Sequence, residues 1–285
     1  MNFRLIRSTA VIAVAGLLAS GALHAQDRKS CERDYKPQVG QSGKDVVWVP
    51  TPDELVQRML RMAKVTPQDI VYDLGAGDGK IAIAAGKAGA TAFGIEYNPD
   101  MAKLAQCYVQ AEGIGNKVKI VQGDIFKEDF SKATVITMYL LPELNLRLRP
   151  TILNMKPGTR VTSHQFTMGD WEADETAEIE YRTAYLWIVP AKVEGSWTLK
   201  EQGGNGQYTV NLTQKFQKVS GDIVAGSAKQ PLVGATLRGE EIKFAFNDDK
   251  GVTRTLTGNV RGNELTGVLK GAGGAETKVT GTRAK

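Results

Sequence analysis

Hydrophobic positions between residues 50 and 190 follow two alternating patterns. Short apolar runs typical of buried strands are separated by longer segments in which apolar residues recur every three or four positions, as in amphipathic helices. The pattern predicts strands at 70–74, 90–97, 118–123, 134–140 and 160–166, helices at 81–87, 99–112 and 143–155, and one or two final strands within 179–189. Strands separated by helices of this length imply right-handed crossovers. We therefore expect an α/β domain over residues 50–192, built as a doubly wound, mostly parallel sheet.

A further helix is predicted at the start of this domain. Thr51 suits the N-cap and Pro52 the first helical position. The expected buried stripe of this helix is Val56, Met59, Leu60 and Ala63, and that of the 99–112 helix is Met101, Leu104, Ala105 and Tyr108.

The pattern changes from Gly195 onward. Helical periodicity ends, alternating apolar and polar residues appear, and this last third holds 16 of the 31 glycines. The segments that begin at Arg238 and Arg261 repeat an Arg-Gly turn 23 residues apart, each suited to a link between two strands. We expect a small antiparallel β domain at residues 195–285, as a meander or a barrel.

The first 25 residues are typical of a signal peptide. Arg4 and Arg7 precede an uncharged run rich in Ala, Val and Leu, and Ala25 offers a cleavage point. The run is short and contains Gly16 and Gly21, which disfavours a permanent membrane span. We expect export, with a periplasmic protein that has no stable membrane span after cleavage, and an uncleaved membrane anchor is the alternative. Residues 26–49 lack periodicity and are expected to form an extended arm.

Charge and rare residues narrow the chemistry. Cleavage would lower the net charge from +5 to +3, too little to indicate nucleic acid, although residues 195–285 alone carry +5. His164 would be the only histidine left, which argues against His-based metal sites and Ser-His-Asp catalysis, so we expect no metal. Cys31 and Cys107 could pair in an oxidising compartment or remain two separate thiols.

The most informative segment runs from Val71 to Lys80. It leads from a strand through Gly75, Gly77 and Gly79 into a helix, the position where open α/β sheets bind ligands. The glycine spacing differs from that of dinucleotide and P-loop motifs, and Asp73 and Asp78 would repel a pyrophosphate. S-adenosylmethionine (SAM) carries a sulfonium and an ammonium, so acidic surroundings favour it.

Two further acids follow the next strands. Glu96 is placed to accept hydrogen bonds from ribose hydroxyls, and Asp124 from an adenine amino group, with Ile125 and Phe126 as apolar cover. Each acid alone could be a solvated strand end, but together with the glycine loop they indicate a SAM site. We also place Ala76 and Tyr97 at the cofactor.

These motifs resemble those of the class I, seven-strand SAM-dependent methyltransferases, which have a Rossmann-like fold. More narrowly, the chain is similar to bacterial relatives of the mitochondrial ATP-synthase c-subunit lysine methyltransferases. The resemblance covers about residues 45–190 and rests on the Val49-Pro-Thr-Pro52 segment, the 73–79 loop with Ile81, the 94–99 segment and Gly123-Asp124. It implies a protein lysine as acceptor and places Pro50 and Thr51 beside the cofactor.

Methyl transfer from SAM requires alignment and exclusion of water more than a dedicated base. Tyr139, after the fourth strand, is our candidate catalytic residue facing the methyl group, and a packed core tyrosine is the alternative. Glu143 and Asn145 are weaker candidates. Because SAM is made in the cytoplasm, export leaves a second hypothesis open: a SAM-fold binding module without catalysis, whose basic β domain binds an envelope partner. A β domain that only stabilises the chain is a further alternative.

Overall fold

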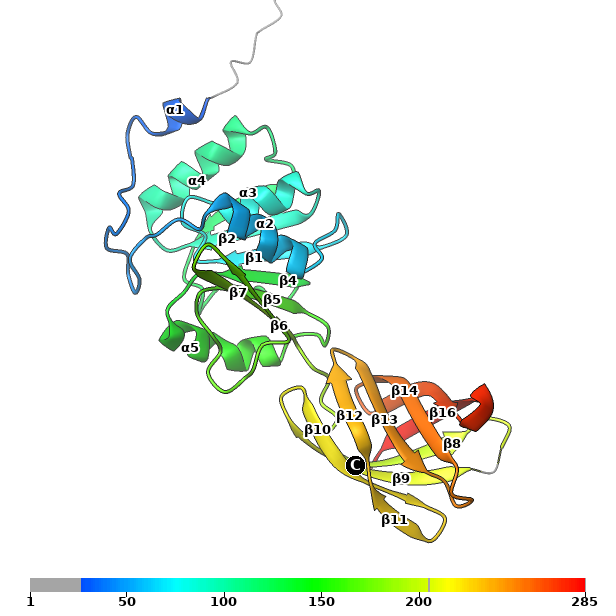
Figure 1. Ribbon diagram of the computed structural model, residues 1–285. Helices are drawn as coiled ribbons and strands as arrows, with labels where there is room; N and C mark the ends of the chain where they lie inside the picture. The colour runs from blue at the N-terminus through cyan, green and yellow to red at the C-terminus, as the bar shows by residue number, and fades with distance from the viewer. Residues whose placement is uncertain (1–26, 205, 285) are drawn as a thin grey trace, which may run out of the picture.

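The computed structural model describes residues 27–204 and 206–284 and arranges them in two β-sheets with separate hydrophobic cores (Figure 1). The signal peptide expected at residues 1–25 lies outside the described residues. A seven-stranded mixed sheet with helices forms the first part, and a nine-stranded antiparallel sheet forms the second. The predicted fold class, an α/β domain with a C-terminal antiparallel β domain, is confirmed.

The first sheet has the strand order β3-β2-β1-β4-β5-β7-β6. Strands β1 to β5 run parallel, and β7 pairs antiparallel with both β5 and β6. Their bounds are β1 Ile70–Leu74, β2 Thr91–Glu96, β3 Val118–Gln122, β4 Val135–Met138, β5 Arg160–His164, β6 Glu175–Ile179 and β7 Arg182–Ile188. The carboxyl ends of β1 to β4 therefore meet at one edge of the sheet, as the sequence predicted.

Helices cover both faces of this sheet. They are α2 Asp53–Met62, α3 Lys80–Lys87, α4 Pro99–Ala111 and α5 Pro142–Leu153. Residues of α2, α3 and α4 share one core, whereas α5 packs into a second core on the other face. All predicted stripe residues of α2 and α4 are buried, because these helices face the sheet. Among the described residues, no helix is both long and apolar enough to cross a membrane.

Two local predictions in this domain need correction. Helix α2 begins one residue later than expected, with Pro52 at the N-cap, and Thr51 makes no capping hydrogen bond. The buried Thr51 hydroxyl instead pairs with His164. The final strands form a hairpin that starts at Glu175, before the expected range of 179–189. The prediction missed β6 because this strand is only half buried and lacks an apolar run.

The second sheet consists of two antiparallel meanders. The order is β11-β10-β9-β8-β16-β15-β14-β13-β12, so that pairing of β16 with β8 joins the meanders. The strands are β8 Gly195–Glu201, β9 Gln207–Lys215, β10 Lys218–Ala225, β11 Ala228–Pro231, β12 Val233–Arg238, β13 Glu241–Asn247, β14 Thr253–Arg261, β15 Glu264–Lys270 and β16 Glu276–Arg283, with a short 3-10 helix η1 Ala272–Gly274.

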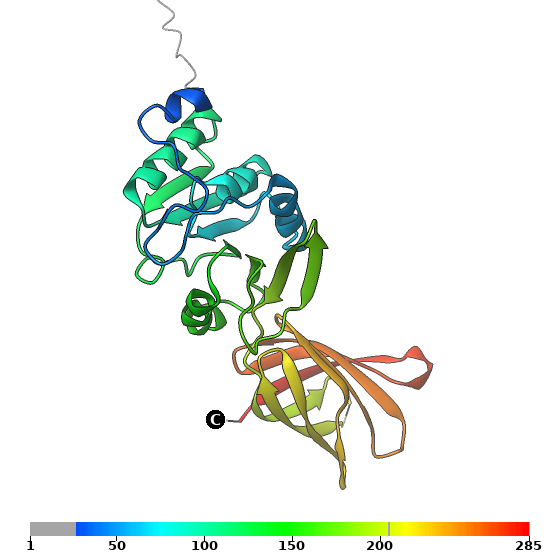
Figure 2. The same cartoon turned by 60° about the vertical axis from the view of Figure 1, so that its left-hand side comes forward.

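This sheet curls around its own core until β10 lies against β12, which gives a nearly closed barrel (Figure 2). The repeated Arg-Gly segments form the β12–β13 and β14–β15 turns, as predicted, with Gly239 and Gly262 in the left-handed conformation. Trp197 lies buried inside the barrel and donates to the carbonyl oxygen of Val193, so it stabilises the core.

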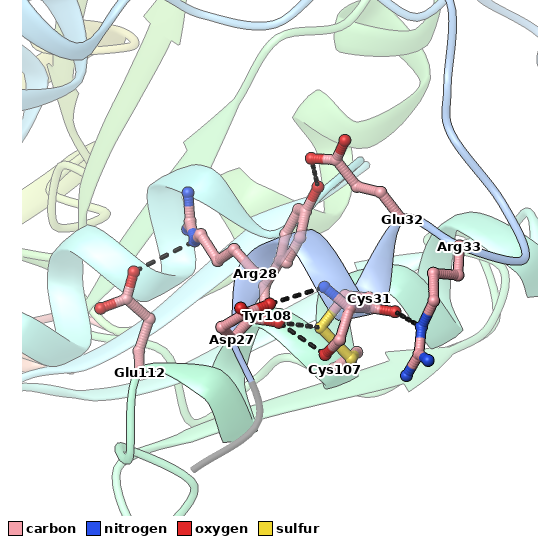
Figure 3. The surroundings of a disulfide bond; sticks show 9 residues. Asp27, Arg28, Cys31, Glu32, Arg33, Cys107, Tyr108 and Glu112 are labelled. Atoms are coloured by element: carbon pink, nitrogen blue, oxygen red, sulfur yellow. Dashed lines mark hydrogen bonds and ion pairs between the residues drawn. A yellow bond between two sulfur atoms is a disulfide. The ribbon is translucent and has the colours of Figure 1, made fainter.

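A disulfide joins the N-terminal arm to the first domain (Figure 3). Helix α1, Arg28–Cys31, lies against α4, and Cys31 is bonded to Cys107 with a Cα–Cα distance of 5.7 Å. Beside it, the Tyr108 hydroxyl donates to Glu32 at 2.9 Å, and Arg28 pairs with Glu112 at 3.1 Å. Of the two states left open by the sequence, the structure has the paired cysteines.

Candidate functional site

A cavity of about 530 Å³ lies at the carboxyl ends of β1 to β4. The glycine loop, the ends of β2 and β4 and the N-terminal arm supply its walls. Twelve of the thirteen residues predicted for the site line it: Pro50, Thr51, Asp73, Gly75, Ala76, Gly77, Asp78, Glu96, Tyr97, Asp124, Ile125 and Tyr139. The topology therefore brings together residues that are distant in the sequence, such as Pro50 and Tyr139, which are 89 positions apart.

The glycine loop is shaped by left-handed backbone at Gly75, Gly77 and Gly79, with φ of 76°, 56° and 78°. L-residues with side chains rarely adopt this conformation. A Cβ on Gly77 would also come within 2.8 Å of the Trp48 Nε1 atom. The loop thus keeps bare backbone against the cavity.

Gly79, the thirteenth predicted residue, does not line the cavity. It is the N-cap of α3, and a Cβ there would come within 3.1 Å of the Ala105 Cβ on α4. Its role in the structure is to turn the loop into α3 and allow close packing of that helix.

Asp73 is buried at the end of β1, and only 2% of its surface is exposed. Its carboxylate accepts a hydrogen bond of 2.7 Å from the Thr137 hydroxyl of the neighbouring strand β4. Burial raises the pKa of Asp73 to about 7, and the nearby carboxylates of Asp78 and Glu96 add to the rise. Burial also raises the pKa of Asp78. A cation bound in the cavity would stabilise the ionised form of these carboxyls and lower their pKa values.

Glu96 links the glycine loop to the next loop of the sheet. One carboxylate oxygen accepts from the Gly77 amide and the other from the Asn98 amide, both at 2.8 Å. Each oxygen retains a lone pair that a ribose hydroxyl could use. Tyr97 follows at the cavity rim and is half exposed.

Asp124 lies after β3 and contacts the N-terminal arm. Its carboxylate accepts from the Phe126 amide at 3.0 Å and from the Lys44 ammonium at 3.0 Å. These two bonds hold the pKa of Asp124 below its usual range. Lys44 also lies 4.3 Å from the centre of the Tyr97 ring. The Asp124 contact with Lys44 was not predicted.

The arm itself is a wall of the cavity that sequence reasoning missed. Residues 41–51 all line it, in a small hairpin in which Ser42 pairs with Val47 and the Gly40 amide bonds to the Trp48 carbonyl. The arm lacks periodicity, so only the Val49-Pro-Thr-Pro52 resemblance hinted at its place.

An aromatic cluster closes the other side of the cavity. The Tyr139 ring lies 3.8 Å from the His164 ring and 6.0 Å from Phe166, and both Tyr139 and Phe166 line the cavity. His164 is buried behind Tyr139, with Nδ1 at 3.0 Å from the Thr51 hydroxyl. Burial lowers the pKa of His164 to about 4, so its imidazole is neutral at pH 7.

His164 and Phe166 were not predicted as site residues, because no motif marks them. Of the weaker candidates, Glu143 is exposed on α5 and does not line the cavity. Asn145 is buried, and its amide donates to the carbonyl oxygens of Phe166 and Thr167. Asn145 therefore supports the wall rather than forming it.

The residues around the cavity fit SAM. Its volume falls within the usual range of about 300–1,000 Å³ for small-molecule sites. The buried acids favour a cationic ligand, and the glycines leave backbone accessible along the loop. Among residues 27–204 and 206–284, no three His, Cys, Asp or Glu side chains are grouped as metal ligands would be.

Comparison with known proteins points to the same chemistry. Residues 73–175 match the ANTKMT methyltransferase domain. A protein-lysine N-methyltransferase of Saccharolobus islandicus is 42% identical over 151 residues, which cover 50% of this chain and 94% of that protein. The mouse lysine N-methyltransferase of the ATP-synthase c-subunit is 26% identical over 176 residues, covering 61% of this chain and 70% of that protein.

A solved structure is also similar. It is an RNA methyltransferase from Salinibacter ruber in complex with S-adenosyl-L-homocysteine, with 46% identity and a TM-score of 0.50 over 51% of this chain and 96% of that one. The segment matched to the methyltransferase domain contains Asp73, the glycine loop, Glu96, Asp124 and Tyr139. The nine-stranded sheet lies outside that segment.

Proposed function

We propose that this chain, which belongs to the ANTKMT family of SAM-dependent methyltransferases, transfers the methyl group to the side-chain amine of a protein lysine. The observation that carries the proposal is the division of the cavity. In the strand order β3-β2-β1-β4-β5, the acids and the glycine loop lie at the ends of β1 to β3, whereas Tyr139 and Phe166 follow β4 and β5, and all line the cavity. The names of the two lysine methyltransferases that the chain resembles support the choice of acceptor.

SAM supplies a methyl group already activated by its sulfonium. We assign Glu96 to the ribose hydroxyls, Asp124 to the adenine amino group and Asp73 to the cationic amino-acid part. Pro50 and Thr51 border the same space from the arm. Ionised Asp73 and Glu96 lie close enough to each other to repel, so binding of a cationic ligand relieves an unfavourable charge arrangement.

The aromatic side of the cavity suits a lysine side chain. Tyr139 and Phe166 can contact the methylene stem, and the Tyr139 hydroxyl can accept or donate a hydrogen bond at the amine. A lysine amine must lose its proton before it attacks a methyl group. Poorly solvated surroundings favour the neutral amine, and both His164 and Tyr139 are uncharged at pH 7.

We further propose that the protein acts outside the cytoplasm. The targeting pattern of residues 1–25 supports export, and the Cys31–Cys107 disulfide is typical of an oxidising compartment. Cell fractionation combined with thiol alkylation tests this. Cytoplasmic protein with two alkylated cysteines would overturn it, and membrane-bound protein with residues 1–25 retained would favour the anchored alternative.

Labelled methyl transfer tests the function. The purified protein is incubated with SAM carrying a labelled methyl group and, in parallel, with envelope proteins or total RNA from cells that lack this protein. The modified residues are mapped by mass spectrometry. We expect label on lysine, loss of label with Asp73→Asn, and normal labelling with the exposed control Glu143→Gln. Label on RNA instead would overturn the lysine assignment. Saturable SAM binding without transfer would favour the non-catalytic binding module.

A further inference from the structure

The β9–β10 turn of the β domain holds a bulky residue in a strained conformation. Lys215 pairs with Lys218, so Phe216 and Gln217 form a two-residue turn. Phe216 has φ of 55°, in a turn position where glycine is the usual residue. Such strain persists only where surrounding contacts fix the residue, and it often marks a functional position.

The surrounding contacts come from the methyltransferase domain. The Phe216 ring stacks with Trp171 at 6.0 Å and lies 5.4 Å from the Arg149 guanidinium. Lys215 pairs with Asp170 at 3.1 Å. On the other side of the turn, Lys218 pairs with Glu172, and the Gln217 amide donates to the Glu172 carbonyl at 2.7 Å. Figure 1 shows the yellow β9–β10 hairpin pointing toward this domain.

The segment contacted by the turn leads directly to the cavity. Residues 165–174 connect β5 to β6, with Phe166 at the cavity wall and Trp171 fully buried. The segment begins with a second strained residue, Gln165, at φ of 68°. The Phe166 amide there bonds to the His164 carbonyl, a tight turn that directs Phe166 beside Tyr139.

Arg149 contacts the middle of this segment at two points. It donates to the Met168 carbonyl at 2.8 Å and pairs with Asp170, the residue that also binds Lys215. The hairpin contacts at Trp171 and Asp170 are therefore linked through Arg149 to the backbone of Met168, two residues after Phe166.

We propose that the β9–β10 hairpin braces residues 165–174, so that the β domain fixes the cavity wall against which the methyl acceptor lies. Phe216 is a positioning residue, since it acts through Trp171 and Phe166. The kinetic part of this inference rests on the proposed acceptor site, whereas the brace itself does not. It gives the β domain a role in catalysis rather than in partner binding alone.

Hydrogen exchange measured by mass spectrometry tests the brace without relying on activity. We expect faster exchange within residues 165–174 in Phe216→Ala and in the double variant Lys215→Ala/Lys218→Ala. The matched control Lys229→Ala/Lys270→Ala also removes two β-domain ion pairs, with Asp222 and Glu276, and should leave the segment unchanged. Unchanged exchange in the brace variants would overturn the proposal. If Phe216→Ala misfolds, the exchange of the double variant Lys215→Ala/Lys218→Ala, whose two lysines are exposed, decides the test.

Kinetics test the consequence. We expect kcat/KM for the acceptor to fall about tenfold in Phe216→Ala, because small displacements of a positioning wall cost large factors in rate. SAM affinity should stay within about twofold, and Phe216→Tyr should restore activity because it keeps the ring. Unchanged kinetics despite faster exchange would reduce the hairpin to a stabiliser and overturn its role. If the unaltered protein methylates no lysine, the proposed function fails while the exchange result still decides the brace.

Discussion

Removing the Cys31–Cys107 disulfide should destabilise the first domain and weaken SAM binding. The perturbation is Cys31→Ser combined with Cys107→Ser, which leaves no unpaired thiol, because these are the two cysteines of the chain. The bond anchors α1 on α4, and the arm that follows α1 becomes a wall of the cavity at residues 41–51. The covalent link therefore restrains the segment that carries Lys44 and Trp48.

The size of the effect follows from the loop that the bond closes. The cysteines are 76 positions apart, and the chain-entropy relation for such a loop gives about 4.5 kcal/mol at 25 °C. Native disulfides typically contribute about 2–5 kcal/mol, so we expect a loss of about 3 kcal/mol. For a domain of this size that corresponds to a fall in Tm of about 6–12 °C. The Arg28–Glu112 ion pair and the Tyr108–Glu32 hydrogen bond would remain, but the ion pair is weakened by water and salt.

Calorimetry and titration with SAM measure the two effects. The double variant should unfold at a lower temperature, and its Kd for SAM should rise about threefold to tenfold because the arm is ordered in only a fraction of molecules. A reducing agent should shift the unaltered protein in the same way and leave the variant unaffected. Equal Tm and equal Kd in the variant would refute the reasoning, since the arm would then be held without the bond.

Four further predictions concern the cofactor side of the cavity. Because the pKa of Asp73 is raised to about 7, the carboxyl becomes protonated and SAM affinity should fall as pH decreases from 8 to 6. The fall should approach tenfold per pH unit below that pKa. A Kd for SAM that does not change with pH in titration calorimetry would contradict this. The raised pKa of Asp73 also means that protonated Asp73 stabilises the ligand-free protein, and this stability should be lost as pH rises from about 4 through 7. Thermal unfolding of the ligand-free protein at several pH values would measure the loss. Gly77→Ala should weaken SAM binding at least about tenfold and cost about 1 kcal/mol of stability, because Gly77 has a positive φ and lies against Trp48. Unchanged binding would show that the loop tolerates a side chain. Lys44→Ala frees the Asp124 carboxylate and should tighten SAM binding about twofold to threefold, whereas weaker binding would show that Lys44 itself contacts the ligand.

Much of the fold could be predicted because local and long-range signals agree. The strand at Ile70–Leu74 has the predicted bounds, and the other parallel strands differ by a few residues at their ends. Parallel strands buried on both faces give continuous apolar runs, and their crossover helices give clear stripes. The half-exposed strand β6 gives neither signal, which is why the final hairpin was placed too late.

The acids of the site were predictable for a topological reason. Once β1, β2 and β3 are parallel neighbours, Asp73, Glu96 and Asp124 must meet at one edge of the sheet. Thr51 shows the limit of this reasoning. A threonine before Pro52 favours an N-cap locally, but the tertiary contact with His164 prevails, and no spacing in the sequence reveals that contact.

The parts of the cavity that the sequence did not predict come from outside the core of the methyltransferase domain. Lys44 and Trp48 reach the cavity from an arm without periodicity, and Phe216 acts on the cavity wall from the β domain. Contacts between distant segments hold both: the Cys31–Cys107 disulfide anchors the arm, and the stacking of Phe216 on Trp171 anchors the turn. The arm borders the Asp124 side, where we place the cofactor, and the hairpin supports Phe166, where we place the acceptor. The two attachments should therefore affect different kinetic constants: loss of the disulfide should raise the KM for SAM, whereas loss of the Phe216 contact should lower kcat/KM for the acceptor.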